Sequence, residues 1–254
     1  MRRPFLDMLH FAIDHDYSIC INGDGVDFMQ LSLQAMTGDL TPSLALFARV
    51  VRRGRRIYYT VGNHDIQLEH FLSDIGPMNV APFLNLRSGE KRIRIEHGHT
   101  YDEMFLKYPR LYWLFTMIGR WSIIIHPRFY KFVHDLNHDI IAGVEYLQSG
   151  FKPRSERMKS VTGEFIEGER QCFREGAEMA GIRGFDAVVF GHTHLEGSIG
   201  LSSGVRYYNT GSWFGAPYCV AIDQGEIWFG PVSDLTTKGD PFPRKRPEQA
   251  AALG

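Results

Sequence analysis

Four fragments share one layout, a short apolar run that ends in polar residues, and this layout most constrains the fold. The clearest is Ala187–Phe190, bounded by Asp186 and followed directly by Gly191-His192-Thr193-His194. A short apolar run between turn residues is typical of a buried strand. Its two histidines therefore leave a strand end close together. The other three fragments are residues 19–24, 58–65 and 93–99.

The spacing of apolar residues predicts an α/β core. Helical spacing is found over residues 5–15, 44–51, 66–76 and 162–180. Strand patterns cover residues 17–22, 57–61, 91–96, 186–190, 205–209, 218–222 and 226–229. Asp223-Gln224-Gly225, between the last two strands, predicts a β-hairpin.

The composition changes at residue 103. Two strongly apolar helical patterns follow and predict a helical hairpin inserted into the core. We therefore expect a first part of the core at residues 1–102, a helical cap at 103–160, a second part of the core at 161–237 and a flexible tail at 238–254. The apolar cap residues fit a lipid slot, and the alternative is that they form core between two lobes or a dimer interface.

Charge, cysteine content and hydropathy limit the partners and the cellular compartment that we expect for this chain. The chain has 254 residues and a formal net charge of −1, so the charge balance does not call for nucleic acid as a partner. Three cysteines without C-x-x-C spacing indicate a reducing compartment, and we expect a cytoplasmic protein. No apolar run reaches the roughly 18 residues of a spanning helix, so any membrane contact is expected to be peripheral, at the inner face.

The polar residues after the strands are typical metal ligands. Oxygen and imidazole donors without thiolate suit Mn²⁺, Fe²⁺, Zn²⁺ or Mg²⁺. Two such ions about 3.5–4 Å apart can clamp a phosphate and activate water. The candidate ligands are Asp24, Asn63, His97, His192 and His194.

These fragments resemble the calcineurin-like metallophosphoesterases. Gly23-Asp24-Gly25-Val26-Asp27, Gly62-Asn63-His64-Asp65, His97-Gly98-His99 and Gly191-His192-Thr193-His194 match four of the five family motifs in order. The resemblance implies a four-layer α/β/β/α sandwich and a dinuclear centre, with Mn²⁺ as the first choice of ion.

The same resemblance implies a role for each matching residue. Asp24 would bridge the two ions, Asn63, His97 and His192 would complete the second site, and His194 would serve the first. His64 would donate a hydrogen bond to the phosphate or a proton to the leaving group, oriented by Asp65, and Asn63 and His64 would face the substrate. His99 and Asp102 are either supporting groups or ordinary loop residues.

The family's first motif, D-x-H, is absent before Asp24. Either the chain begins at an internal methionine and lacks the first strand, or the first metal site is truly incomplete. We favour the first explanation, because losing that strand would leave its neighbour with an unpaired edge. In either case only one metal site is nearly complete, and the activity of the chain as printed is in question.

The cap resembles, in placement and composition, the lid of the UDP-2,3-diacylglucosamine pyrophosphatase branch. We therefore expect hydrolysis of a phosphoester or pyrophosphate, with a lipid-linked nucleotide sugar as the preferred substrate and peripheral membrane contact through the cap. One alternative is a general phosphodiesterase or phosphatase with a soluble substrate. Another is a non-catalytic binding protein of the same fold. A homodimer through the cap is left open.

Overall fold

The computed structural model describes residues 2–25, 33–71, 78–110, 112, 114, 117–118, 166, 169–213 and 216–242. Most of the predicted cap, including its second helix, and the tail beyond residue 242 lie outside these residues. The domain boundaries at 160 and 161 therefore stay predictions. Among the described helices, none combines the length and the apolar character needed to cross a membrane.

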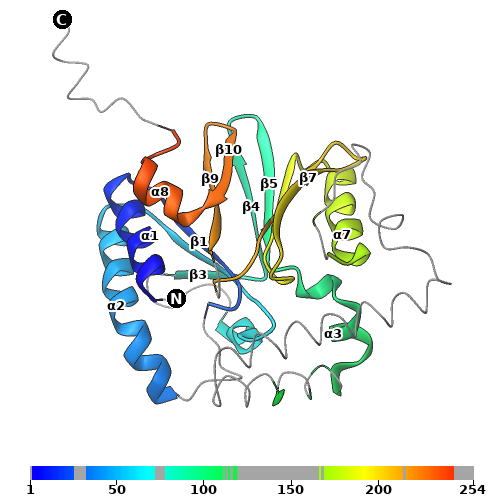
Figure 1. Cartoon of the computed structure of the whole chain (residues 1–254), viewed down its shortest axis with the longest axis horizontal. Helices are drawn as coiled ribbons and strands as arrows, with labels where there is room; N and C mark the ends of the chain where they lie inside the picture. The colour runs from blue at the N-terminus through cyan, green and yellow to red at the C-terminus, as the bar shows by residue number, and fades with distance from the viewer. Residues whose placement is uncertain are drawn as a thin grey trace, which may run out of the picture.

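Two sheets stacked between helices form the core (Figure 1). The first sheet contains three parallel strands, β1 (Ile19–Asn22), β2 (Ile57–Thr60) and β3 (Met78–Ala81), in that order. The second has the order β4-β5-β6-β8-β7. Its strands are β4 (Phe83–Ser88), β5 (Lys91–Glu96), β6 (Ala187–Phe190), β7 (Glu196–Gly200) and β8 (Arg206–Thr210).

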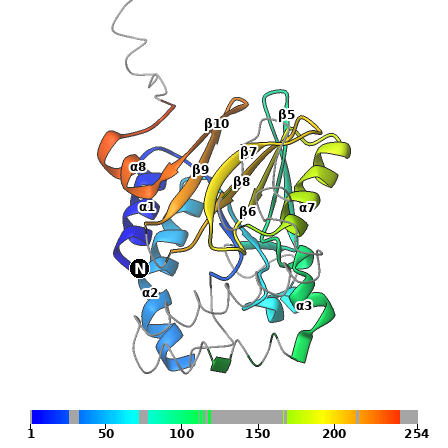
Figure 2. The same cartoon turned by 45° about the vertical axis from the view of Figure 1, so that its right-hand side comes forward.

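Helices cover the outer face of each sheet (Figure 2). One side holds α1 (Arg2–Asp14), α2 (Leu33–Arg52) and α8 (Val232–Lys238), and the other holds α7 (Gln171–Ile182). The hairpin of β9 (Tyr218–Asp223) and β10 (Glu226–Pro231) packs between the layers, against β5, β6 and β8. The predicted four-layer α/β/β/α fold is thus confirmed.

Strand β6 shows why the sequence folds into layers. Its four residues are all buried. Val188 and Phe190 pack against α7, whereas Ala187 and Val189 face the space between the sheets. Successive side chains of a strand point to opposite faces, so a strand covered on both faces must be apolar throughout.

Several element boundaries differ from the predictions. Helix α2 begins at Leu33 rather than at residue 44, because Pro42 lies inside it and hides its helical pattern. Residues 66–71 form the 3₁₀ helix η1 (Ile66–Phe71) rather than the predicted α-helix, and residues 72–77 lie outside the described part. Helix α7 begins at Gln171, not at residue 162, since Glu169 and Arg170 are already non-helical.

The predictions missed the strands β3, β4 and β7, the 3₁₀ helix η2 (His99–Tyr101) and the helix α8. Strand β7 contains two glycines, and β4 has no buried residue, so neither carries a strong apolar pattern. Strand β1 pairs with β2 alone in the described part of the sheet. The expected further strand beside β1 remains a prediction.

Candidate metal centre

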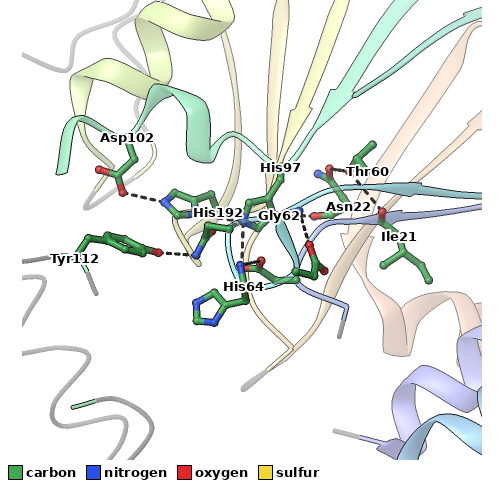
Figure 3. A network of polar contacts seen from close by, with 12 residues as sticks. Ile21, Asn22, Thr60, Gly62, His64, His97, Asp102, Tyr112 and His192 are labelled. Carbon is green, nitrogen blue, oxygen red and sulfur yellow. Dashed lines mark hydrogen bonds and ion pairs between the residues drawn. The ribbon is translucent and has the colours of Figure 1, made fainter. Parts of the chain in front are cut away.

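Four strand ends meet at one place in the molecule. Strands β1 and β2 run parallel in one sheet, and β5 and β6 run parallel in the other. The polar motifs follow the carboxyl ends of these strands, which is where ligands bind in open α/β sheets. Figure 3 shows His97 and His192, from different loops, side by side next to the β1 residue Asn22.

The Nε2 atom of His97 is the meeting point of the cluster. It lies 3.1 Å from Asp24 Oδ2, 3.0 Å from Asn63 Oδ1 and 3.2 Å from His192 Nδ1. Asp24, His97 and His192 form a group whose potential ligand atoms all lie within 4.8 Å of one another. The structure therefore brings together all four residues that the sequence predicts for the second metal.

Hydrogen bonds on the outer side fix the tautomers of both rings. His97 donates from Nδ1 to the Asn22 carbonyl over 3.0 Å, and His192 donates from Nε2 to Asp102 over 2.9 Å. In a neutral imidazole the other nitrogen then carries a lone pair. His97 Nε2 and His192 Nδ1 thus turn their lone pairs toward each other, as metal-binding histidines do.

The spacing of these atoms fits a divalent ion. Ligand atoms about 2.1 Å from an ion are separated by roughly 3.0–3.4 Å in octahedral or tetrahedral geometry. The distances around His97 Nε2, 3.0–3.2 Å, fall within that range. The pocket also attracts positive charge, because the Asp24 carboxylate raises the pKa of His97 although burial alone would lower it.

Backbone geometry places Asp24. The residue has a positive φ of 50°, and its Oδ1 accepts a hydrogen bond from the His64 amide over 2.9 Å. Burial opposes ionisation, but His97 and His64 outweigh it and hold the pKa of Asp24 well below its usual range. Gly62 is required at this point, since a Cβ there would lie 2.1 Å from Asp24 Oδ1.

A tyrosine in the inserted region orients Asn63. Its Nδ2 donates to the Tyr112 hydroxyl over 2.5 Å, which turns its Oδ1 toward His97 (Figure 3). Tyr112 lies within the predicted cap, so a residue of that region contacts the predicted metal ligand Asn63 directly. Burial raises the pKa of Tyr112, so its hydroxyl stays protonated at neutral pH. No motif in the sequence predicts this contact.

His64 and Asp65 have separate surroundings. The His64 ring points away from the His97 and His192 rings (Figure 3). The Asp65 carboxylate accepts hydrogen bonds from the Tyr59 hydroxyl and, over 2.6 Å, from the Gly62 amide. Asp65 therefore holds the turn that carries Asn63. Its predicted role in orienting His64, and the catalytic role of His64, stay predictions.

His194 and His99 lie beside the cluster. His194 has a φ of 60° and is not part of the metal-type group found among the described residues. Its assignment to the first metal stays a prediction. His99 is 6% exposed, and its Nδ1 has no hydrogen-bond partner among the residues that the structure describes. Burial, together with the nearby His97 and His192, lowers the pKa of His99 to about 4.

Asp102 and Arg170 support His192. Asp102 accepts from His192 and also pairs with Arg170 over 2.7 Å. Burial opposes ionisation of Asp102, but both partners outweigh it and keep its pKa well below the usual range. The sequence left Asp102 open between a supporting group and a plain loop residue, and the structure shows the former. The motif pattern contained no signal for Arg170.

Similarity to known proteins is found among family models and among solved structures. The family model described as calcineurin-like phosphoesterase matches residues 3–196. Among solved structures, a single mutant of Vps29 from Entamoeba histolytica is similar, with 12% sequence identity and a TM-score of 0.36 over 85% of this chain and 78% of that chain. A comparison with curated proteins finds no match.

Proposed function

The chain belongs to the calcineurin-like phosphoesterase family, and from this premise we propose that it hydrolyses a phosphoester or pyrophosphate bond with the help of divalent metal ions. The observation that carries the proposal is the set of four donor atoms formed by His97 Nε2 and three neighbours. Asp24, Asn63 and His192 each turn an electron-rich atom toward His97 Nε2 at 3.0–3.2 Å. Such a cluster is stable only with positive charge at its centre.

The bound ions would supply Lewis acidity and lower the pKa of water. The chain's own residues would hold the ions and orient the groups around them. One ion would be bound by Asp24, Asn63, His97 and His192. Asp24 would also bind a second ion, together with His194. Asn22 and Asp102 keep the two imidazoles in the tautomers that expose a lone pair. His64 would donate a proton or hydrogen bond to the phosphate or the leaving group.

For the substrate we propose a lipid-linked nucleotide-sugar pyrophosphate of the UDP-2,3-diacylglucosamine type. Support comes from the inserted region, where Leu106, Leu114 and Ile118 are 59%, 49% and 41% exposed. The same region carries Tyr112, whose hydroxyl contacts Asn63. Exposed apolar side chains there suit an acyl chain. Peripheral membrane contact or dimerisation through this region belongs to the same proposal. We propose Mn²⁺ as the ion, because a donor set of carboxylate, amide and imidazole without thiolate suits hard or borderline divalent ions.

Two measurements test the proposal. Metal analysis of protein purified with Mn²⁺ should find up to two ions per chain. Hydrolysis should then be assayed on bis-p-nitrophenyl phosphate and on a diacylated UDP-sugar. Turnover of both supports the lipid-linked substrate, whereas turnover of the diester alone favours a soluble substrate. Metal binding without turnover of either substrate would contradict the hydrolase and favour the non-catalytic alternative.

A further inference from the structure

Two adjacent residues of opposite charge, one buried and one partly buried, lie where the chain rejoins the core after the predicted cap. Glu169 is 2% exposed, and the side chain of Arg170 is 13% exposed. Both precede α7, and neither belongs to a motif that the family resemblance assigns. Burying a charged side chain costs several kcal/mol unless it is paired, so each needs a structural reason.

Glu169 begins a chain of hydrogen bonds to the histidine loop, residues 191–194. Its Oε1 accepts from the Tyr207 hydroxyl and, over 3.2 Å, from Asn209 Nδ2. The same amide nitrogen of Asn209 donates to Thr193 Oγ1 over 2.6 Å. Thr193 stands between His192 and His194. The carboxylate is therefore linked, through one amide, to the residue between two predicted metal ligands.

Arg170 approaches the same loop from the other side. It pairs with Asp102, which accepts the Nε2 hydrogen of His192. The Arg170 guanidinium lies 5.0 Å from the ring centre of Phe173, and that ring lies 5.7 Å from the His192 ring. Residues 169–173 thus contact the histidine loop by two polar chains and one ring contact.

Stability alone does not account for Glu169. The neighbouring residues Phe173, Ala177 and Ala180 form an apolar core with β6, into which an apolar side chain would fit at lower cost. Burial raises the pKa of Glu169 to about 7, with Tyr207 and Asn209 opposing that rise, so the site is strained for a carboxylate. What the carboxylate adds is a fixed orientation of Asn209.

We propose that Glu169 is a positioning residue of the metal centre, which fixes the histidine loop through Asn209 and Thr193. The importance of this role for catalysis rests on the proposed function, whereas the test of the role does not.

The first test changes one hydroxyl. Thr193→Val removes the oxygen that Asn209 contacts while preserving size, and Thr193→Ser retains it. In metal-free protein, amide hydrogen exchange of residues 191–194 should be at least ten-fold faster in Thr193→Val and near the parent rate in Thr193→Ser. These amides are suitable probes, because those of Gly191 and His192 donate to the His97 carbonyl over 3.1 and 3.0 Å. Equal exchange in both variants would overturn the proposal.

The second test changes the carboxylate. Glu169→Ala is compared with Glu175→Ala, a change at an exposed carboxylate on α7. Supporting partners of metal ligands typically affect affinity by about 10–100-fold, so Mn²⁺ affinity, measured by titration calorimetry, should fall by that factor in Glu169→Ala only. A lower Tm of Glu169→Ala with unchanged Mn²⁺ affinity would show a merely structural residue and overturn the proposal.

These readouts separate the inference from the proposed function. A parent protein that binds Mn²⁺ without hydrolysing any substrate contradicts the hydrolase, yet the affinity comparison still decides the role of Glu169. If the parent bound no Mn²⁺, the exchange rates of residues 191–194 in Glu169→Ala against Glu175→Ala would decide it. Faster exchange throughout the protein, rather than in this loop, would count against positioning.

Discussion

At the residue scale, metal binding at the candidate centre depends on which atom of each side chain faces His97 Nε2. His97 is constrained on both nitrogens, by the Asn22 carbonyl on one side and the donor cluster on the other. His64, in contrast, has its ring directed away from that cluster (Figure 3). Substitutions at these two histidines should therefore affect different properties.

We expect Asp24→Ala and His97→Ala to lose the bound metal, and with it activity. His64→Ala should retain metal, because its ring is outside the cluster, while kcat falls by about 10²–10⁴-fold, as for loss of a general acid. Metal content by elemental analysis and kcat with bis-p-nitrophenyl phosphate check this. The reverse pattern, metal loss in His64→Ala alone, would contradict the assigned roles.

Gly62 gives a second prediction at this scale. A Cβ on residue 62 would lie 2.1 Å from Asp24 Oδ1, so Gly62→Ala must displace the Asp24 carboxylate. We expect at least a ten-fold loss of Mn²⁺ affinity. Gly54→Ala is the control, because no described atom lies within 4 Å of a Cβ there and its positive φ of 73° adds backbone strain without crowding. Unchanged affinity in Gly62→Ala would show that Asp24 is not a ligand.

At the element scale, the β9–β10 hairpin shows what local sequence can decide. Gln224 and Gly225 both have positive φ, 49° and 86°, as a two-residue type I′ turn requires. Glycine adopts this conformation freely, whereas glutamine is strained there. The hairpin was predicted from Asp223-Gln224-Gly225, and the register pairs Asp223 with Glu226.

Gln224→Asn should therefore stabilise the protein by about 0.5 kcal/mol, because asparagine tolerates the left-handed region and Asn-Gly is the preferred type I′ pair. Gln224→Val should destabilise it, since a β-branched residue is poorly tolerated at positive φ. Urea unfolding of both variants measures the difference. Equal stability of the two variants would mean that the turn is not formed in solution.

At the scale of the whole molecule, Glu169 makes stability depend on pH. Its pKa is raised from 4.5 to about 7, chiefly by burial, so the folded state keeps a proton that the unfolded state has lost. Rising pH therefore favours unfolding between these two pKa values. The stability contributed by the bound proton is complete below the pKa of Glu169 in the unfolded chain. It is lost as the pH rises through the pKa of Glu169 in the folded protein. Tyr207, Asn209 and Arg174 are the groups that oppose the shift.

Glu169→Gln should remove this dependence, since glutamine does not titrate. Between about pH 5 and about pH 8, the parent should lose more free energy of unfolding than the variant, as measured by urea unfolding at each pH. Glu175→Gln, at an exposed position, should follow the parent. Parallel pH profiles for the parent and Glu169→Gln would contradict the raised pKa.

Much of the sandwich was predictable, because buried strands and amphipathic helices carry their periodicity in the sequence. Ala187–Phe190 and Lys91–Glu96 were identified this way. Elements with weak patterns were missed, such as β7 with its two glycines. The four ligands of the predicted second metal could be named because each follows a strand end, although their roles remain to be tested.

The sequence by itself determined the family, the order of the strands that bear motifs and the donor atoms available to a metal. Each of these is local, a run of apolar residues followed by a polar turn. Only the tertiary structure decided which atoms support the donors. Tyr112 on Asn63, Arg170 on Asp102 and Glu169 on Asn209 join segments far apart in the chain. No local pattern encodes such pairs, because they form only when the inserted region and both sheets are packed together.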